Sequence, residues 1–155
     1  MLESQITATR MLYNANKFRD AYQIALQPLC EETGLLQTAV DILLFLANNP
    51  GYDTARDICR CRGLKPGLVS FHVDRLVGEG FLERREIPGD RRKTGLVCTA
   101  RAQGIIEEGR RLQKAFAARL LEGLNQEDLD HFAQCLAAFD RNIESIRKSG
   151  LQSRP

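Results

Sequence analysis

The first fifty residues carry two different patterns of apolar positions. From about residue 3 to residue 27, apolar side chains recur three or four positions apart, which predicts an amphipathic helix. Pro28 is expected to end this helix, because proline lacks an N–H and its ring clashes with the preceding turn. The segment Leu36 to Asn48 is apolar on nearly every face and predicts a second, buried helix, which the Pro-Gly of "NNPGY" stops.

Capping residues mark two further helices in the middle of the chain. Thr54 can cap a short helix over Ala55 to Cys61, and Gly63 can close it. Pro66 suits the first turn of the next helix, because its missing N–H has no intrahelical partner there. We expect that helix to run to residue 78 or 79 with a single apolar stripe.

After this helix the period of the apolar pattern changes. The runs "FLERREI" (residues 81–87) and "TGLVCT" (residues 94–99) predict two short β-strands. They are separated by the turn sequence Pro88-Gly89-Asp90 and by three consecutive cations. The sequence therefore predicts a β-hairpin with a basic tip.

Two long helices are predicted to follow the hairpin. Thr99 can cap a helix that reaches about Glu122, where Gly123 breaks it. Asn125 can cap the last helix, which continues an apolar stripe to about Lys148. The order of elements predicts a mainly α fold with a small β-hairpin wing, which is a winged helix-turn-helix with long N- and C-terminal helices.

The long flanking helices cannot bury their apolar faces on so small a module, so we expect a homodimer in which they pair across a two-fold axis. Residues 1–34 and 100–155 would form the helical dimerisation region. Residues 35–99 would form the winged helix-turn-helix, giving one intertwined domain per protomer.

Charge is distributed unevenly along the chain. Residues 54–99 hold ten Lys/Arg and six Asp/Glu, whereas the remainder holds twelve and fourteen, so the basic excess lies in one central block. That distribution fits a module that binds a polyanion. The longest apolar run, residues 42–47, is far short of the roughly 20 residues of a membrane helix, and "MLESQITATR" does not read as a signal peptide. A cytoplasmic protein that does not enter the membrane is the expectation.

The five cysteines are Cys30, Cys59, Cys61, Cys98 and Cys135. An odd number without a secretion signal argues against a disulfide framework. On a helix, Cys59 and Cys61 point about 200° apart, and two histidines are too few for an obvious zinc site, so no cofactor is expected. The sequence has no Gly-rich phosphate loop, nucleophile elbow or spaced His/Cys/Asp constellation, which argues against an enzyme.

Three segments together carry a resemblance to a known family. They are "DILLFLANNPG" (residues 41–51), "VDRLVGEGFLERR" (residues 73–85) and "GDRRKTGLVCT" (residues 89–99). In this order and spacing the chain resembles the MarR (multiple-antibiotic-resistance regulator) family of bacterial winged-helix transcription factors over about residues 10–146. The resemblance implies a sequence-specific regulator, most simply a ligand-responsive repressor, that binds a pseudo-palindromic operator in double-stranded DNA as a homodimer.

The wing carries the most specific part of this resemblance. The family has an Asp-x-Arg pair in the wing and a threonine seven residues after that arginine, which here are Asp90, Arg92 and Thr99. An arginine at a hairpin tip can enter the narrow minor groove, where the negative potential is deepest. We therefore expect Arg92 in the minor groove, oriented by Asp90, and Arg91 and Lys93 at phosphates. A solvated turn is the alternative.

The helix that begins at Pro66 is expected to lie in the major groove, with its N-terminal residues nearest the bases. Its candidate DNA contacts are Lys65, Gly67, Ser70, Phe71 and Arg75. Many family members have an arginine where this chain has Phe71, whose ring can pack on thymine methyl groups or against the wing. Arg75 can bind a phosphate or pair with a carboxylate. His72 is interpreted as a packed core residue, with a DNA or metal ligand as the alternative.

In the family, small aromatic or phenolic effectors bind between the dimerisation and DNA-binding regions. Tyr13, Phe18 and Tyr22 on the first helix can line such a pocket, or can belong to an ordinary core or dimer interface. Two other functions stay open. One is a thiol- or metal-responsive regulator that uses its cysteines, and the other is a winged-helix module for protein contacts, for which an apolar wing would be more typical.

Overall fold

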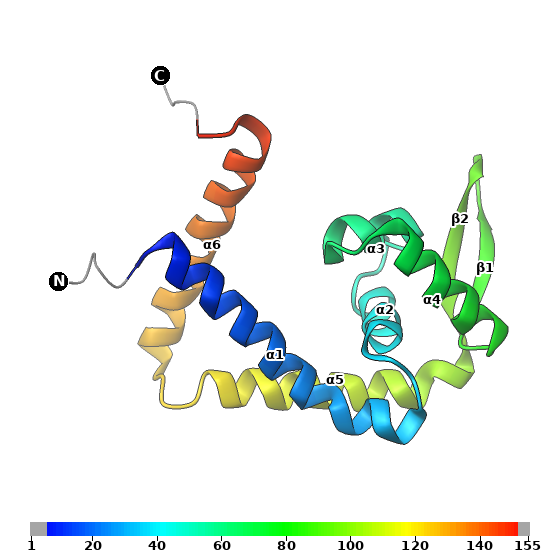
Figure 1. Ribbon diagram of the computed structural model, residues 1–155, viewed down its shortest axis with the longest axis horizontal. Helices are drawn as coiled ribbons and strands as arrows, with labels where there is room; N and C mark the ends of the chain where they lie inside the picture. Colours follow the sequence, from blue (N-terminus) through cyan, green and yellow to red (C-terminus); the bar gives the residue numbers. More distant parts are fainter. Residues whose placement is uncertain (1–5, 152–155) are drawn as a thin grey trace. The chain divides into compact units, whose positions relative to one another are not determined.

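The computed structural model describes residues 6–151, and the chain divides into two compact units. In chain order the elements are α1 (Ala8–Thr33), α2 (Gln37–Asn48), α3 (Ala55–Arg62), α4 (Pro66–Gly78), β1 (Leu82–Ile87), β2 (Asp90–Cys98), the 3-10 turn η2 (Ala100–Ala102), α5 (Gln103–Leu120) and α6 (Gln126–Ser149). The first unit ends at Phe116 within α5, and the second begins at Ala117. This is the predicted winged helix-turn-helix with long flanking helices (Figure 1).

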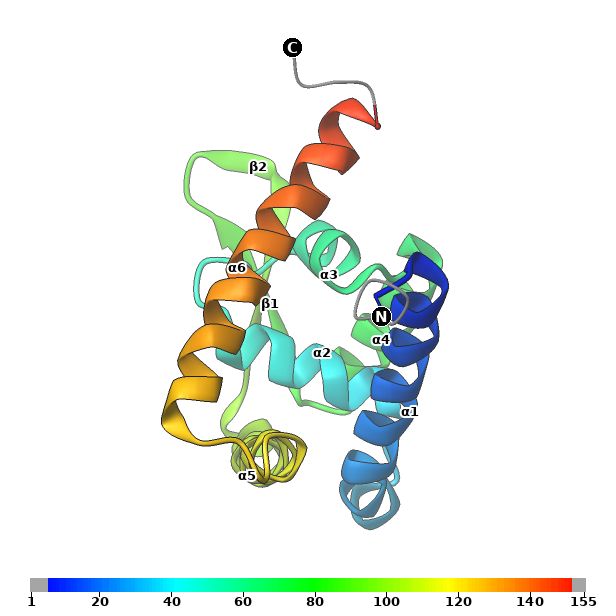
Figure 2. The same ribbon diagram turned by 90° about the vertical axis from the view of Figure 1, so that its left-hand side faces the viewer.

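α2 is the centre of the first unit. Because it is apolar on nearly every face, it packs against α1, α3, α4 and β2, which surround it in Figure 2. Leu43 is fully buried, and Leu44 packs so closely on α5 that a methyl group at Gly109 would lie 2.6 Å from its Cδ2. The predicted buried second helix is confirmed.

The helix-turn-helix forms from local signals. Thr54 and Asp57 make a reciprocal capping box at the start of α3, and Gly63 ends α3 with a φ of +64°. Pro66 occupies the first turn of α4, as predicted. The buried side of α4 consists of Val69, His72, Val73 and Leu76.

The wing is an antiparallel hairpin of β1 and β2, in which residues 82–86 pair regularly with residues 94–98. Ile87 then pairs with Asp90, so residues 91–93 bulge out of β2 beside the turn. The sequence predicts the three cations in the connection between the strands. They belong to β2 instead, because the pairing of Asp90 starts that strand before them.

Hydrogen bonds of backbone and side chain hold the base of the wing. The N–H of Leu96 donates to the carbonyl of Asp53 at 2.7 Å, which joins β2 to the loop before α3. The hydroxyl of Thr99 donates to the carbonyl of Gly80 at 2.6 Å. The prediction that Thr99 caps the fifth helix is therefore wrong, because its side chain is used here and η2 precedes the start of α5 at Gln103.

α1 begins later and ends later than the sequence predicts. Thr7 is extended and caps α1, so a continuous helix from residue 3, itself outside the described residues, is wrong. Pro28 lies inside α1 rather than at its end. Leu26 and Leu29 on either side of it are buried in the core, and this packing outweighs the roughly 3 kcal/mol that proline costs inside a helix.

The second unit contains α6. Asn125 and Asp128 form the capping box at its start, which confirms the predicted N-cap. None of its residues is buried. Its exposed large apolar side chains, each between 41% and 49% exposed, are Phe132, Leu136, Phe139, Ile143 and Ile146. No helix within residues 6–151 is long and apolar enough to cross a membrane.

Candidate nucleic-acid interface

The exposed side of α4 holds most of the predicted major-groove contacts. Lys65 is the N-cap residue, and Gly67, Ser70 and Phe71 lie on the solvent-facing side, away from the buried stripe. A methyl group at Gly67 would meet no atom within 4 Å, so the helix backbone is open there. Within residues 6–151 the hydroxyl of Ser70 has no hydrogen-bond partner, which leaves it available to an outside group.

The other charged side chains of α4 are engaged within the chain. Nε of Arg75 donates to Oε1 of Glu79 at 2.8 Å, which is the carboxylate pairing that the sequence left as one of two alternatives. Asp74 is paired with Arg84 of β1. Among the described residues 65–79, Lys65 is the one charged side chain that makes no ion pair.

Phe71 stands largely in solvent. Its side chain is 57% exposed, and its ring meets the ring of His72 edge-on with the centroids 5.1 Å apart. Leu68, one helical turn earlier, is 42% exposed. Sequence reasoning missed Leu68, although its spacing of three residues from Phe71 is the signal that places both on one side of the helix.

His72 lies beneath this surface, as the core interpretation predicts. It is 3% exposed, and its Nδ1 is buried with no hydrogen-bond partner among residues 6–151. Burial, together with the nearby charge of Arg75, lowers the pKa of His72 from its ordinary value of 6.5. The neutral imidazole is therefore the form that belongs to the folded helix-turn-helix.

Asp90 organises the cationic bulge of the wing. Its Oδ1 accepts a hydrogen bond from the backbone N–H of Arg92 at 3.0 Å, and its Oδ2 lies 3.7 Å from Nζ of Lys93. Asp90 thus fixes the backbone of Arg92, and its ion pair is with Lys93 rather than with the guanidinium of Arg92. The sequence predicts Lys93 at a phosphate, whereas in this structure Lys93 is paired with Asp90.

Arg91 and Arg92 are the unneutralised charges of the bulge. Both are exposed, and neither guanidinium makes an ion pair with any of residues 6–151. On β1, Arg85 lies 3.5 Å from Glu83, and Arg84 is paired with Asp74 of α4. The wing therefore offers two free guanidinium groups beside its turn, a suitable form for contact with phosphates or a narrow minor groove.

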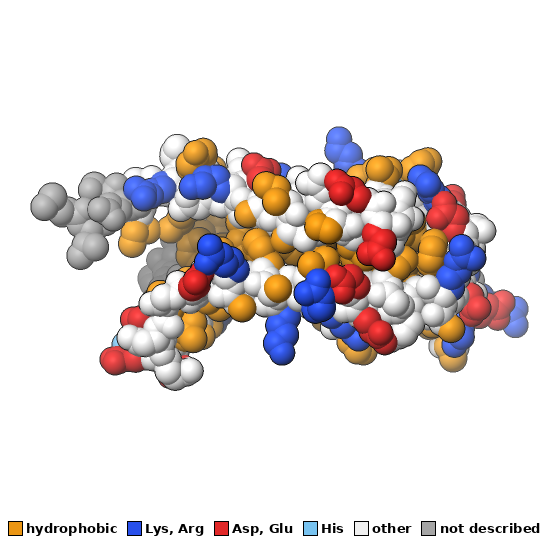
Figure 3. Space-filling model, turned by 90° about the horizontal axis from the view of Figure 1, so that it is seen from below, with side chains coloured by type: hydrophobic (Ala, Val, Ile, Leu, Met, Phe, Trp, Pro, Cys, Tyr) orange, Lys and Arg blue, Asp and Glu red, His pale blue; other side chains and the backbone are white. Residues whose placement is uncertain are grey.

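Two of the three predicted effector-pocket residues lie together. Phe18 and Tyr22 of α1 both meet Phe116 of α5 edge-on, with ring centroids 5.4 Å and 5.6 Å apart. Viewed from below, hydrophobic side chains gather along the seam between α1 and α5 (Figure 3). These rings line a cleft of about 880 Å³ that also reaches α2 and the turn after α3. Tyr13 does not line it and lies instead near the start of α1, under Lys17.

The polar wall of this cleft connects α2 with α3 and α1 with α5. Asp41 and Arg62 approach to 3.5 Å, and Nε2 of Gln113 donates to the hydroxyl of Tyr22 at 2.8 Å. Burial raises the pKa of Asp41, while Arg62 opposes the shift. The cleft thus combines aromatic walls with a partly buried ion pair, which suits a small aromatic molecule with polar substituents.

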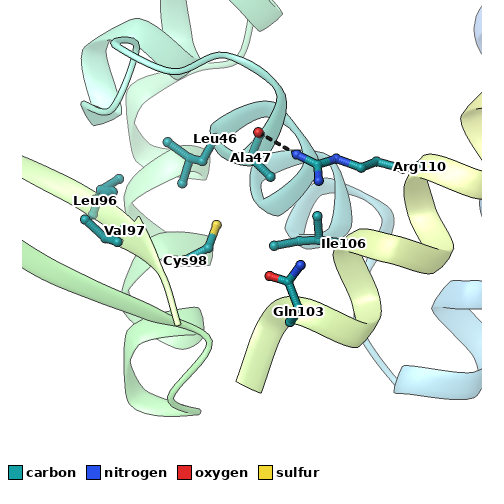
Figure 4. Close-up of a pocket in the computed structure, with 8 residues that line it drawn as sticks. All are labelled: Leu46, Ala47, Leu96, Val97, Cys98, Gln103, Ile106 and Arg110. Carbon is teal, nitrogen blue, oxygen red and sulfur yellow. Dashed lines mark hydrogen bonds between the residues drawn. The ribbon is translucent and has the colours of Figure 1, made fainter. Parts of the chain in front are cut away.

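A second, smaller pocket of about 300 Å³ lies between β2, the end of α2 and the start of α5. Cys98 and Ile106 face one another across it (Figure 4). Arg110 closes one side by donating to the carbonyl of Ala47 at 2.7 Å. Burial raises the pKa of the Cys98 thiol, which makes it a poor nucleophile.

The remaining cysteines do not assemble into a site. Burial, followed by the charges of Asp41 and Glu31, raises the pKa of Cys30. Cys59 is half-buried and Cys61 is exposed. In the described part of the chain, no three His, Cys, Asp or Glu residues are placed to hold a metal ion.

Comparison with known proteins agrees with this geometry. Residues 33–93 match the family model described as the MarR family. The transcriptional regulator PA3341 is 22% identical over 88% of this chain and 97% of its own, with a TM-score of 0.76. A MarR-family regulator from Listeria monocytogenes, solved with a 26mer DNA, is 14% identical over 96% and 99%, with a TM-score of 0.74.

A third solved structure carries a small molecule. CouR from Rhodococcus jostii RHA1, bound to p-coumaroyl-CoA, is 20% identical over 83% of this chain and 87% of its own, with a TM-score of 0.65. At these identities the structural likeness establishes the fold, a winged helix-turn-helix between long helices.

Proposed function

Residues 33–93 match the model of the MarR family, and from that match we propose that the chain is a MarR-family, sequence-specific, DNA-binding transcriptional repressor that acts as a homodimer. Members of this family are transcriptional regulators and not enzymes. Each protomer would place α4 in a major groove and the bulge of β2 in an adjacent minor groove. Such a regulator would work in the cytoplasm, where the chromosome is.

One observation carries this proposal: Arg91 and Arg92 are exposed, make no ion pair with any of residues 6–151, and lie on the hairpin whose strand β1 packs against α4. Free cations beside an exposed helix provide phosphate contacts next to a surface that can reach base edges. The Listeria monocytogenes regulator, which shares this fold, was solved with DNA. Asp90 supports the arrangement by fixing the backbone of Arg92 at 3.0 Å.

The homodimer rests on the apolar stripe of α6. Phe132, Leu136 and Phe139 recur at the four- and three-residue spacing of a helix-pairing seam, yet each is more than two-fifths exposed in the single chain. Pairing α1, α5 and α6 with a second copy would bury them. In this proposal residues 1–34 and 100–155 dimerise, residues 35–99 bind DNA, and the operator is a pseudo-palindrome with half-sites about one helical turn apart.

Effector binding is proposed for the cleft between Phe18, Tyr22 and Phe116. A small aromatic molecule there would touch α1 and α5. Through Asp41 and Arg62 it would also touch the helix-turn-helix. It would release DNA by stabilising a dimer geometry whose half-site spacing does not fit the operator. CouR, which shares the fold, was solved with p-coumaroyl-CoA bound.

Selection of bound sequences from random duplex DNA tests the proposal. We expect an inverted repeat whose affinity falls steeply with salt, because the phosphate contacts release counterions. An Arg91→Ala/Arg92→Ala protein should fail to enrich it, whereas Arg141→Ala, which removes a cation from α6, should enrich the same repeat. If the wild-type protein enriches no sequence under reducing, oxidising or metal-loaded conditions, DNA recognition is wrong and a protein-contact role replaces it.

A further inference from the structure

Two large apolar side chains stand in solvent on the surface of α4. Leu68 is 42% exposed and Phe71 is 57% exposed, and their spacing of three residues makes them neighbours on the helix. The fold itself uses the other side of α4, where Val69 and Val73 are buried. Covering the exposed pair with a partner would lower the free energy of the system, because apolar surface would leave water.

Few polar groups near this pair can read a base. Guanine is most often read by two hydrogen bonds from an arginine or lysine. Over residues 65–78 there are two such side chains: Lys65 at the N-cap, ahead of the first turn, and Arg75, whose Nε is bound to Glu79 at 2.8 Å. Asp74, which could accept from a cytosine amine, is held by Arg84. The hydroxyl of Ser70 is left beside an otherwise apolar surface.

Cations at the start of α4 and on the wing, whose strand β1 packs against α4, indicate what covers the pair. Lys65 at the start of α4 and Arg91 and Arg92 on the wing make no ion pairs with any of residues 6–151. DNA phosphates can pair with these three cations, whereas a purely apolar partner offers them no counter-charge. The apolar group that a major groove presents is the 5-methyl of thymine.

Building on the proposed function, we propose that Leu68 and Phe71 select the operator by packing against thymine 5-methyl groups in the major groove. The base pairs that Leu68 and Phe71 contact are then A·T pairs rather than the G·C pairs that an arginine would choose. The open backbone at Gly67, where a methyl group would meet nothing within 4 Å, allows the helix to lie close to these methyl groups.

Deoxyuridine tests this inference, because it lacks the 5-methyl group and keeps the hydrogen-bonding groups of thymine. The full-length protein is titrated by fluorescence anisotropy against its selected operator and against duplexes in which each thymine is replaced in turn. We expect at least one position in each half-site where the replacement weakens binding about fourfold, the value for one buried methyl group. Phe71→Ala should weaken binding to the thymine operator and remove the difference at the position it contacts.

Ser70→Ala is the matched control, because Ser70 lies on the same exposed side of α4 but offers little apolar contact. It should keep the wild-type sensitivity to deoxyuridine. Since Phe71 is largely exposed, its alanine variant should fold normally, which circular dichroism and an unchanged affinity for a scrambled duplex would verify.

The outcomes separate this inference from the proposed function. Equal affinity for thymine and deoxyuridine duplexes at every position, in a protein that still selects an operator, would overturn methyl recognition alone. Unchanged sensitivity in both Leu68→Ala and Phe71→Ala would overturn it too, because other residues would then contact the methyl groups. Failure to select any sequence would overturn the proposed function and this inference together.

Discussion

The wing and α4 pack together in one unit, yet they present opposite chemistry to solvent. On β2, Arg91 and Arg92 are exposed beside the turn and make no ion pair within residues 6–151. On α4, Arg75 is paired with Glu79, and the most exposed large apolar side chain is Phe71. One surface is suited to a uniform negative charge, and the other is suited to particular base edges.

This contrast divides affinity from sequence recognition. Contacts from free guanidinium groups to phosphates or the minor groove strengthen binding to nearly any duplex and weaken with salt. Apolar and hydroxyl contacts in the major groove add little on a wrong sequence, because they depend on where the thymine methyl groups lie. Changes in the wing should therefore alter affinity, and changes in α4 should alter sequence preference.

The largest effect is expected from breaking the proposed homodimer, because the dimer presents two copies of both the wing and α4 to DNA. Leu136→Glu places a charge in the apolar stripe of α6, where an unpaired charge at an interface is costly. Sedimentation velocity should show a monomer, and operator affinity should fall about a hundredfold or more through loss of the second half-site. Arg141→Glu, on the opposite side of the helical wheel, should stay dimeric. A dimeric Leu136→Glu protein with normal binding would refute the α6 interface.

Next in size is the loss of a wing cation. Arg92→Ala should weaken operator binding about ten- to a hundredfold and reduce the salt slope by about one, with the fold intact because the side chain is exposed. Anisotropy titrations at several salt concentrations measure both quantities. Arg141→Ala removes an equal charge and should change neither. Wild-type affinity in Arg92→Ala would show that the wing does not contact DNA.

Gly67→Ala sharpens the comparison from the side of α4. The added methyl group meets no atom of the protein within 4 Å, so stability should rise by up to about 1 kcal/mol. Operator binding should weaken about tenfold, because the methyl group would stand between the helix and the bases. Urea denaturation and anisotropy measure the two effects. A more stable protein with unchanged affinity would place DNA further from α4 than we propose.

Ser70→Ala should act on sequence preference more than on affinity. Loss of one hydrogen bond is expected to weaken operator binding about fivefold and to leave binding to scrambled duplexes unchanged. Competition against operators mutated at each base pair measures this difference. A uniform loss on every sequence would instead make Ser70 a phosphate contact. Ser70 would then contribute to affinity, like the wing, rather than to sequence preference.

The smallest effect concerns the buried side of α4. Because the pKa of His72 lies below its ordinary 6.5, the unfolded chain takes up the proton first as the pH falls. Stability should therefore be lost below about pH 6.5, by at most about 1.4 kcal/mol per pH unit for one proton. His72→Leu should flatten this part of the urea-denaturation pH profile. His131→Gln, at an exposed site on α6, should leave it unchanged.

The sequence predicts the fold well where local signals decide it. The caps at Thr54 and Asn125, the turn at Gly63 and the start at Pro66 are all confirmed. It fails where tertiary packing decides. Pro28 continues a helix because buried leucines flank it, and residues 91–93 join β2 through a bulge that no local pattern encodes.

The candidate site is predictable in its residues but not in their pairing. That Lys65, Gly67 and Ser70 share an exposed side follows from helical geometry alone. That Arg75 binds Glu79 depends on the side-chain rotamers of both residues, which helical spacing alone does not give. That Tyr13 lies away from the cleft of Phe18 follows from the crossing of α1 and α5, which periodicity does not give.

The most direct measurement of the central claim is the affinity of the wild-type protein for its selected operator and for a scrambled duplex of the same length, each over a range of salt concentrations. We predict similar salt slopes, since the same cations meet phosphates in both, with the operator bound at least about a thousandfold more tightly. Equal affinities at every salt concentration would contradict the account, because the protein would then bind DNA as a charged surface and α4 would read no sequence.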